Sequence, residues 1–153
     1  MIKYTDTQVV FREFPDEVAL AINLSLCPNR CEGCHSPYLR EDLGAELDIP
    51  SLDALVRKNT GITCVGFMGG DNDPETLLSL MRHVKDMYGL KCGWYSGRDA
   101  ADPAILSSNI CDYIKTGHYD ESAGPLDKET TNQRMLRLAD GVYMDITHMF
   151  WKK

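Results

Sequence analysis

Apolar and polar residues follow one another along the chain in patterns that predict strands and helices in turn. Residues 18–26 form an almost continuous apolar run, which is typical of a strand buried on both faces of a parallel sheet. Ahead of this run, the pattern over residues 2–14 predicts a short amphipathic β-hairpin with a turn near Thr5-Asp6-Thr7. We therefore expect the chain to begin with a hairpin that is followed by a buried strand.

After residue 50 the periodicity switches repeatedly between that of a helix and that of a strand. Helices are predicted over residues 51–58, 73–88 and 103–108. Strands are predicted over residues 62–68, 90–95 and 113–115, with a terminal segment over 142–149. Ser51 is the expected N-cap of the first helix, and Gly89 is expected to end the second. This alternation predicts an α/β fold with mostly parallel strands and right-handed crossovers.

The length of the chain limits how complete such a fold can be. A closed barrel of eight strand and helix units needs about 250 residues, whereas this chain has 153. No repeat, low-complexity tract or long linker divides the sequence. We expect a single domain over residues 1–153 that forms a partial, incomplete β/α barrel or an open sheet.

Composition and charge disfavour several classes of function. The chain is 43% hydrophobic and 25% charged, which is the balance of an ordinary globular protein. Its net charge of -7, without a block of consecutive Lys or Arg, does not favour nucleic acid as a partner. No apolar stretch approaches the roughly eighteen residues of a membrane span, and the first residues lack the order of a signal peptide. We therefore expect a cytoplasmic protein that has no membrane partner.

The chain contains six cysteines, which their spacing separates into two groups. In a reducing compartment cysteines serve as metal ligands, redox groups or small buried hydrophobes rather than as disulfides. Three of them fall within eight residues and can surround one metal centre: Cys27, Cys31 and Cys34. The other three are isolated and are expected to be small buried side chains: Cys64, Cys92 and Cys111.

Three familiar kinds of site share part of this spacing. The stretch Cys31-Glu32-Gly33-Cys34-His35 matches the C-x-x-C-H pattern of c-type haem attachment, but that site needs export in most systems and gives Cys27 no role. A structural zinc site needs a fourth ligand, such as His35 or a distant cysteine, and the sequence lacks paired C-x-x-C knuckles. A thioredoxin-like dithiol also leaves out Cys27. The role of Cys27 thus decides between these kinds of site.

The full C-x3-C-x2-C pattern, which follows the first buried strand, resembles the signature of the radical S-adenosylmethionine (SAM) superfamily. The resemblance implies a partial β/α barrel of the radical SAM type. It also implies that Cys27, Cys31 and Cys34 are the catalytic ligands of a [4Fe–4S] cluster, whose fourth iron binds the amino and carboxylate groups of SAM. Reduction of that cluster would cleave SAM into methionine and a 5′-deoxyadenosyl radical.

Further stretches fit the same resemblance and supply the expected SAM-binding residues. Gly69-Gly70-Asp71 follows a predicted strand and resembles the Gly-Gly-Glu type motif that meets the methionine amino group. Two glycines let a backbone approach a ligand closely, although a simple turn has the same composition. Ser96, in Tyr95-Ser96-Gly97, would contact the ribose or the carboxylate, and His35 would supply charge near the carboxylate or the cluster.

Within the superfamily, the sequence looks like the activating proteins of anaerobic ribonucleoside-triphosphate reductase. The additional shared motifs are Gly124-Pro125-Leu126 and Thr130-Thr131-Asn132-Gln133-Arg134. This resemblance implies that the radical removes a hydrogen atom from a glycine of the large reductase subunit, and that a flavodoxin-like or other low-potential reductant supplies the electron. Two positions depart from the family patterns. Gly33 stands where many superfamily members have an aromatic residue, and His35-Ser36-Pro37 stands where many activases have Asn.

Two other functions are compatible with the cysteine motif. One is activation of another glycyl-radical enzyme of the pyruvate formate-lyase type, although such activases are generally longer. The other is non-catalytic electron transfer by an iron–sulfur protein, which would need a fourth cysteine ligand. The remaining cysteines lack suitable local spacing for that role.

Overall fold

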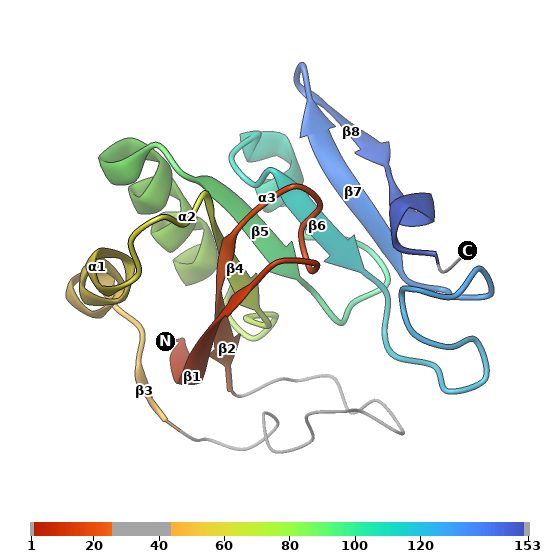
Figure 1. The fold of residues 1–153 in the computed structure, drawn as a ribbon, viewed down its shortest axis with the longest axis horizontal. Helices are drawn as coiled ribbons and strands as arrows, with labels where there is room; N and C mark the ends of the chain where they lie inside the picture. The colour runs from red at the N-terminus through yellow and green to blue at the C-terminus, as the bar shows by residue number, and fades with distance from the viewer. Residues whose placement is uncertain (1, 26–43, 152–153) are drawn as a thin grey trace.

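The computed structural model describes residues 2–25 and 44–151, which form one sheet with helices on one face (Figure 1). The strands lie in the order β3-β1-β2-β4-β5-β6-β7-β8. Their bounds are β1 (Lys3–Val10), β2 (Ala19–Leu24), β3 (Ala45–Glu46), β4 (Cys64–Met68), β5 (Lys91–Tyr95), β6 (Tyr113–Thr116), β7 (Arg134–Ala139) and β8 (Val142–Asp145). The cysteine motif, with Cys27, Cys31, Cys34 and His35, lies outside the described residues.

The centre of the sheet is parallel and its two sides are antiparallel. β2, β4, β5 and β6 pair in parallel, whereas β1 pairs antiparallel with β2 and β3, and β7 with β6 and β8. The α/β class is confirmed, but the expected mostly parallel sheet is wrong, because four of the seven pairings are antiparallel. Parallel neighbours need a long crossover, and the connections that lead to β4, β5 and β6 contain α1, α2 and α3. Over the described residues the sheet is open, with β3 and β8 at its edges.

The predicted hairpin within residues 2–14 is also wrong, because β1 runs through the expected turn. The strand pairs with β2, and its register shifts between Tyr4 and Asp6. The Asp6 carboxylate accepts hydrogen bonds from Thr5 at 2.6 Å and, across the pair, from Asn23 at 3.0 Å. A bulge of this kind absorbs an irregular polar stretch without ending the strand. The hairpin is therefore formed by β1 and β2.

A second hairpin, β7 with β8, is missing from the sequence prediction. It turns at Asp140-Gly141, where both residues have positive φ, at 50° and 78°. That conformation matches the two-residue turns that Asp-Gly favours between antiparallel strands. The predicted terminal segment over 142–149 contains β8 and the short helix η2 (Thr147–Phe150).

The three α-helices begin alike, with an aspartate followed by a proline in the first turn. They are α1 (Ile49–Lys58), α2 (Pro74–Tyr88) and α3 (Pro103–Ser108), capped by Asp48, Asp73 and Asp102. The predicted N-cap Ser51 is instead the third helical residue, and it completes a capping box with Asp48. Gly89 ends α2 in the left-handed conformation, as expected. Within the described parts of the chain, no helix is long and apolar enough to cross a membrane.

The helices cover one face of the sheet, and the connection between β1 and β2 crosses the other (Figure 1). We call this second side the helix-free face because none of α1, α2 and α3 packs on it, although the short 3-10 helix η2 does; its buried residues are Phe14, Ala19, Cys64, Tyr113, Leu126 and Met135. Phe14 packs directly on the sheet at Gly66 and Gly93, where a Cβ atom would lie 2.4 Å and 2.2 Å from the ring. The two glycines make room for the aromatic ring in the middle of β4 and β5.

Candidate functional site

The carboxyl ends of the four parallel strands meet at one edge of the sheet. Asn23, Met68, Tyr95 and Lys115 are successive register partners across β2, β4, β5 and β6. The Gly69-Gly70-Asp71 stretch follows β4 directly, and Ser96 follows β5. Ligands of open α/β sheets bind outside such carboxyl ends. We call this region the carboxyl edge.

Asp71 and Ser96, which sequence places on different strands, are in direct contact at this edge. The Ser96 hydroxyl donates to Asp71 Oδ1 at 2.6 Å, and the backbone N–H of Gly97 donates to Asp71 Oδ2 at 2.9 Å. The Arg98 guanidinium donates to the Asp71 carbonyl oxygen at 3.2 Å. Asp71 is 3% exposed and Ser96 is 1% exposed. The carboxylate therefore ties the end of β4 to the turn after β5.

Gly69 and Gly70 have backbone conformations that side chains disfavour, with φ of 119° and 91°. A Cβ atom on Gly69 would lie 3.3 Å from the Leu24 Cβ, and one on Gly70 would lie 3.1 Å from the Leu24 Cδ1. Trp94 Nε1 donates to the Gly69 carbonyl oxygen at 2.7 Å. The glycines thus bring the end of β4 against Leu24, the last residue of β2.

Lys115 is a polar residue of this edge that sequence reasoning missed. Its side chain points to the helix-free face and its ammonium group is buried, donating to the carbonyl oxygens of Ser96 at 2.9 Å and Gly117 at 2.8 Å. The ammonium also lies 5.9 Å from the centre of the Tyr95 ring. A lysine inside an otherwise apolar strand was the signal available, since buried lysines are rare and must be paired.

The isolated cysteines are buried and free, as expected from their apolar surroundings. Burial raises the pKa of the Cys92 thiol to about 12, and it raises the pKa values of the Cys64 and Cys111 thiols as well. Burial therefore disfavours the thiolate form of these side chains, which is the form that binds metals. The described residues also contain no group of three or more His, Cys, Asp or Glu side chains arranged for a metal ion. The predicted metal ligands Cys27, Cys31 and Cys34 lie outside these residues, as does His35.

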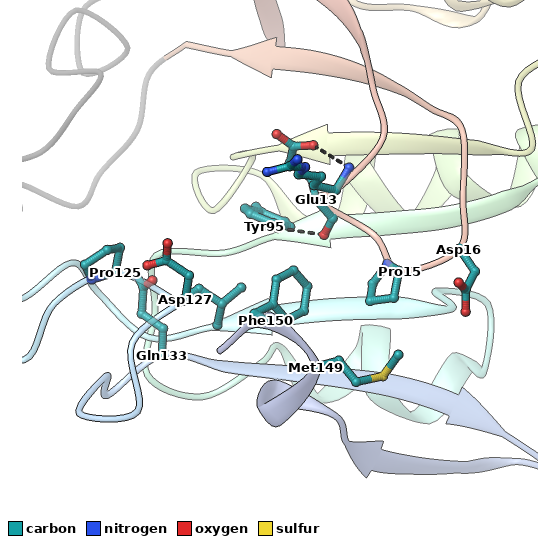
Figure 2. A pocket seen from close by; sticks show the side chains of 11 residues that line it. Glu13, Pro15, Asp16, Tyr95, Pro125, Asp127, Gln133, Met149 and Phe150 are labelled. Carbon is teal, nitrogen blue, oxygen red and sulfur yellow. Dashed lines mark hydrogen bonds between the residues drawn. The ribbon is translucent and has the colours of Figure 1, made fainter. Parts of the chain in front are cut away.

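A cavity of about 670 Å³ opens on the helix-free face (Figure 2). It is lined by the connection between β1 and β2, the end of β5, parts of the 125–133 segment and helix η2. Pro125, Leu126 and Gln133 belong to the two late sequence motifs, and all three line this cavity. Thr130, the first residue of the polar motif, stabilises the loop around it, because its hydroxyl donates to the Ala123 carbonyl oxygen at 2.5 Å. The cavity was not foreseen, since its walls come from segments distant in sequence.

Comparison of the chain with protein-family models, curated proteins and solved structures finds no match. The function of the carboxyl edge and of the cavity must therefore be inferred from their own residues and from the cysteine spacing. Three features bear on it: a glycine turn, a buried carboxylate–serine pair, and a cavity whose wall includes Tyr95, the residue before Ser96.

Proposed function

We propose that the chain is a radical SAM activating enzyme that generates a glycyl radical on anaerobic ribonucleoside-triphosphate reductase. The observation that carries the proposal is the arrangement of Gly69, Gly70, Asp71 and Ser96 at the carboxyl edge. β2 ends at the same edge with Leu24, and the C-x3-C-x2-C motif begins three residues later in the sequence, at Cys27. In this proposal the parallel strands β2, β4, β5 and β6 correspond to part of a radical SAM barrel.

The described part of the edge suits a ligand such as SAM. The turn at Gly69 and Gly70 has no side chains of its own, and Leu24 and Leu77 fill the space where their Cβ atoms would lie, so a ligand would approach the turn from another side. Asp71 already accepts bonds from Ser96 and Gly97, so its first role is to hold the turn in shape. The Ser96 oxygen also accepts from the Arg98 N–H at 3.1 Å, which fixes its orientation. We infer that the backbone of the glycine turn meets the ligand and that Asp71 and Ser96 position it.

Cys27, Cys31 and Cys34 would hold the [4Fe–4S] cluster. When bound, this cluster supplies the low-potential electron that cleaves SAM to methionine and a 5′-deoxyadenosyl radical. The protein has to keep water and other hydrogen donors away from the reaction and present the target glycine. The Lys115 side chain is buried beside the edge, where its Nζ atom donates to the carbonyl oxygens of Ser96 and Gly117. A flavodoxin-like or other low-potential protein would reduce the cluster.

Anaerobic reconstitution with iron and sulfide tests this function. Addition of dithionite and SAM should yield 5′-deoxyadenosine, and further addition of the reductase should yield a glycyl radical in its electron paramagnetic resonance spectrum. Well-reconstituted protein that yields no 5′-deoxyadenosine would contradict the proposal and would favour a non-catalytic electron carrier. A radical on pyruvate formate-lyase but not on the reductase would correct the target.

Single cysteine variants supply the matched control. Cys27→Ala should abolish both the cluster absorbance and SAM cleavage, because the motif provides only three thiolates. Cys64→Ala should keep both, because Cys64 is a buried, protonated thiol of the helix-free face. Full SAM cleavage by Cys27→Ala would instead point to a site built on Cys31 and Cys34 alone.

A further inference from the structure

The cavity on the helix-free face adjoins the carboxyl edge. Tyr95 forms part of its wall and immediately precedes Ser96, which contacts Asp71. Gln133 also lines the cavity, and its side-chain amide lies 3.4 Å from the carbonyl oxygen of Gly117, just after β6. A molecule bound in the cavity would therefore lie next to the proposed SAM site.

Contacts within the protein hold the walls of the cavity in place. The Tyr95 hydroxyl donates to the Glu13 carbonyl oxygen at 2.6 Å, as Figure 2 shows, and the Tyr113 hydroxyl donates to the Pro15 carbonyl oxygen at 3.1 Å. Phe14 packs edge-on against Tyr95, with ring centres 5.3 Å apart. These contacts fix the connection between β1 and β2 on the sheet. Binding to a cavity formed in advance avoids much of the cost of ordering its walls.

The lining combines acidic groups with apolar surface. Three of its side chains carry carboxylates, Glu13, Asp16 and Asp127, whereas Arg12 carries the one guanidinium. Leu126, Met149 and Phe150 supply apolar surface, and Met149 is 47% exposed at the opening. An excess of carboxylates repels phosphates and attracts cations. The volume of about 670 Å³ lies within the range of about 300–1,000 Å³ that is typical of binding cavities.

We propose that the cavity binds the segment of the partner protein that carries the target glycine, and that this segment is extended and cationic. The inference rests on the proposed function, because only a target placed beside the SAM site can donate a hydrogen atom to the radical. Basic side chains of the segment pair separately with the carboxylates of Asp16 and Asp127, which lie at opposite ends of the cavity (Figure 2), and an apolar side chain packs on Met149 and Phe150. The charge of the cavity thus selects the protein to be activated.

Neutralising the acidic wall tests the proposal. The double variant Asp16→Asn, Asp127→Asn keeps the size of both side chains, and asparagine tolerates the left-handed φ of 66° at position 16. The affinity of the intact reductase for this variant, measured by biolayer interferometry without SAM, should fall by about tenfold or more, and less at high salt. Glycyl radical formation should fall in parallel. Formation of 5′-deoxyadenosine without the reductase should be unchanged.

Two further variants serve as a matched control and as an independent test of the cavity. Asp86→Asn removes an exposed carboxylate of α2, which packs on the opposite face of the sheet, and should leave binding and activation unchanged. Met149→Lys adds a positive charge at the exposed opening and should weaken reductase binding even if the double variant folds poorly. Wild-type affinity in Met149→Lys and in the folded double variant would overturn the proposal. Absence of 5′-deoxyadenosine from wild-type protein that still binds the reductase would instead contradict the proposed function.

Discussion

The Ser96 hydroxyl donates a hydrogen bond of 2.6 Å to the Oδ1 atom of Asp71, and the two side chains are 1% and 3% exposed. This contact joins the ends of two neighbouring parallel strands, at the edge where the proposed ligand binds. A buried hydrogen bond to a carboxylate contributes more than one between neutral groups, and it is costly to leave half made. The pair therefore determines the shape of the carboxyl edge.

Asp71→Asn should destabilise the protein by about 1–3 kcal/mol, which is the usual cost of leaving a buried polar group unpaired. Asparagine can accept from Ser96 through its one oxygen, but its amide group would then face the Gly97 N–H, which now donates to Asp71 Oδ2. Urea unfolding measures the loss. SAM cleavage by the reconstituted variant should fall as well, and unchanged stability together with unchanged cleavage would remove Asp71 from the site.

Gly70→Ala should be more harmful than Gly61→Ala, although both glycines have similar positive φ values of 91° and 86°. The left-handed backbone alone costs an alanine about 1–2 kcal/mol. A Cβ atom on Gly70 also meets Leu24 at 3.1 Å and Leu77 at 3.3 Å, whereas one on Gly61 has no neighbour within 4 Å. Thermal unfolding measures the loss of stability, which both variants should show. Only Gly70→Ala should also lower SAM cleavage. Equal losses of cleavage would mean that the close approach at Gly70 is unimportant.

Stability should fall as the pH rises above about 8.5, the ordinary pKa of a thiol. The pKa of Cys92 is raised to about 12 in the folded protein because its thiol is buried, so the unfolded chain loses this proton first. The folded state then binds more protons than the unfolded state, and stability declines over that interval. Urea unfolding between pH 7.5 and pH 10.5, with a reductant present, measures the decline. Cys92→Ala should make its first part shallower without abolishing it, because burial raises the pKa values of the Cys64 and Cys111 thiols in the same direction. An identical decline in that variant would exclude Cys92 as a cause.

The packing of α1 on α2 should weaken in acid. Asp53 of α1 accepts hydrogen bonds from the Tyr88 hydroxyl at 2.6 Å and from His83 Nε2 at 2.7 Å, both on α2, and these bonds lower the pKa of its carboxyl. The contribution is complete above the unfolded value of about 3.9 and is lost as the pH falls through the lower folded value. Hydrogen exchange of α1 at pH 5 and pH 3 should show the loss. Asp53→Asn should lower protection already at pH 5 and reduce the difference between the two conditions.

Elements with strong local signals were predictable from the sequence. Asp73, Pro74 and Gly89 mark the ends of α2 by chemistry that acts within a few residues, and the apolar runs of β2 and β4 match strands that are covered on both faces. β7 is not evident from the sequence, because Arg134, its first residue, belongs to the polar motif and Arg137 interrupts its short apolar run. Asp140-Gly141 is a local signal for the hairpin of β7 and β8, whereas the antiparallel pairing of β7 with β6 depends on which strands meet.

The residues of the candidate site also fall into those that local sequence predicts and those that depend on tertiary contacts. The glycine turn and Ser96 stand out as short polar or glycine stretches after apolar strands, so their placement at strand ends follows from the sequence. The bond between Asp71 and Ser96 and the burial of Lys115 depend on the register between strands. The cavity depends on a chain connection that crosses the whole face. Tertiary contacts of this kind leave no mark on any one segment.

Phe14 lies against Gly66 and Gly93, two positions that are far from it in sequence and from each other. Substitutions at these three positions are therefore coupled to one another. A side chain at position 66 or 93 requires a smaller residue at position 14, and a smaller residue at position 14 removes a support of Tyr95 in the cavity wall. Variation at the two glycines should thus be tolerated only in chains that have also rebuilt this wall of the cavity.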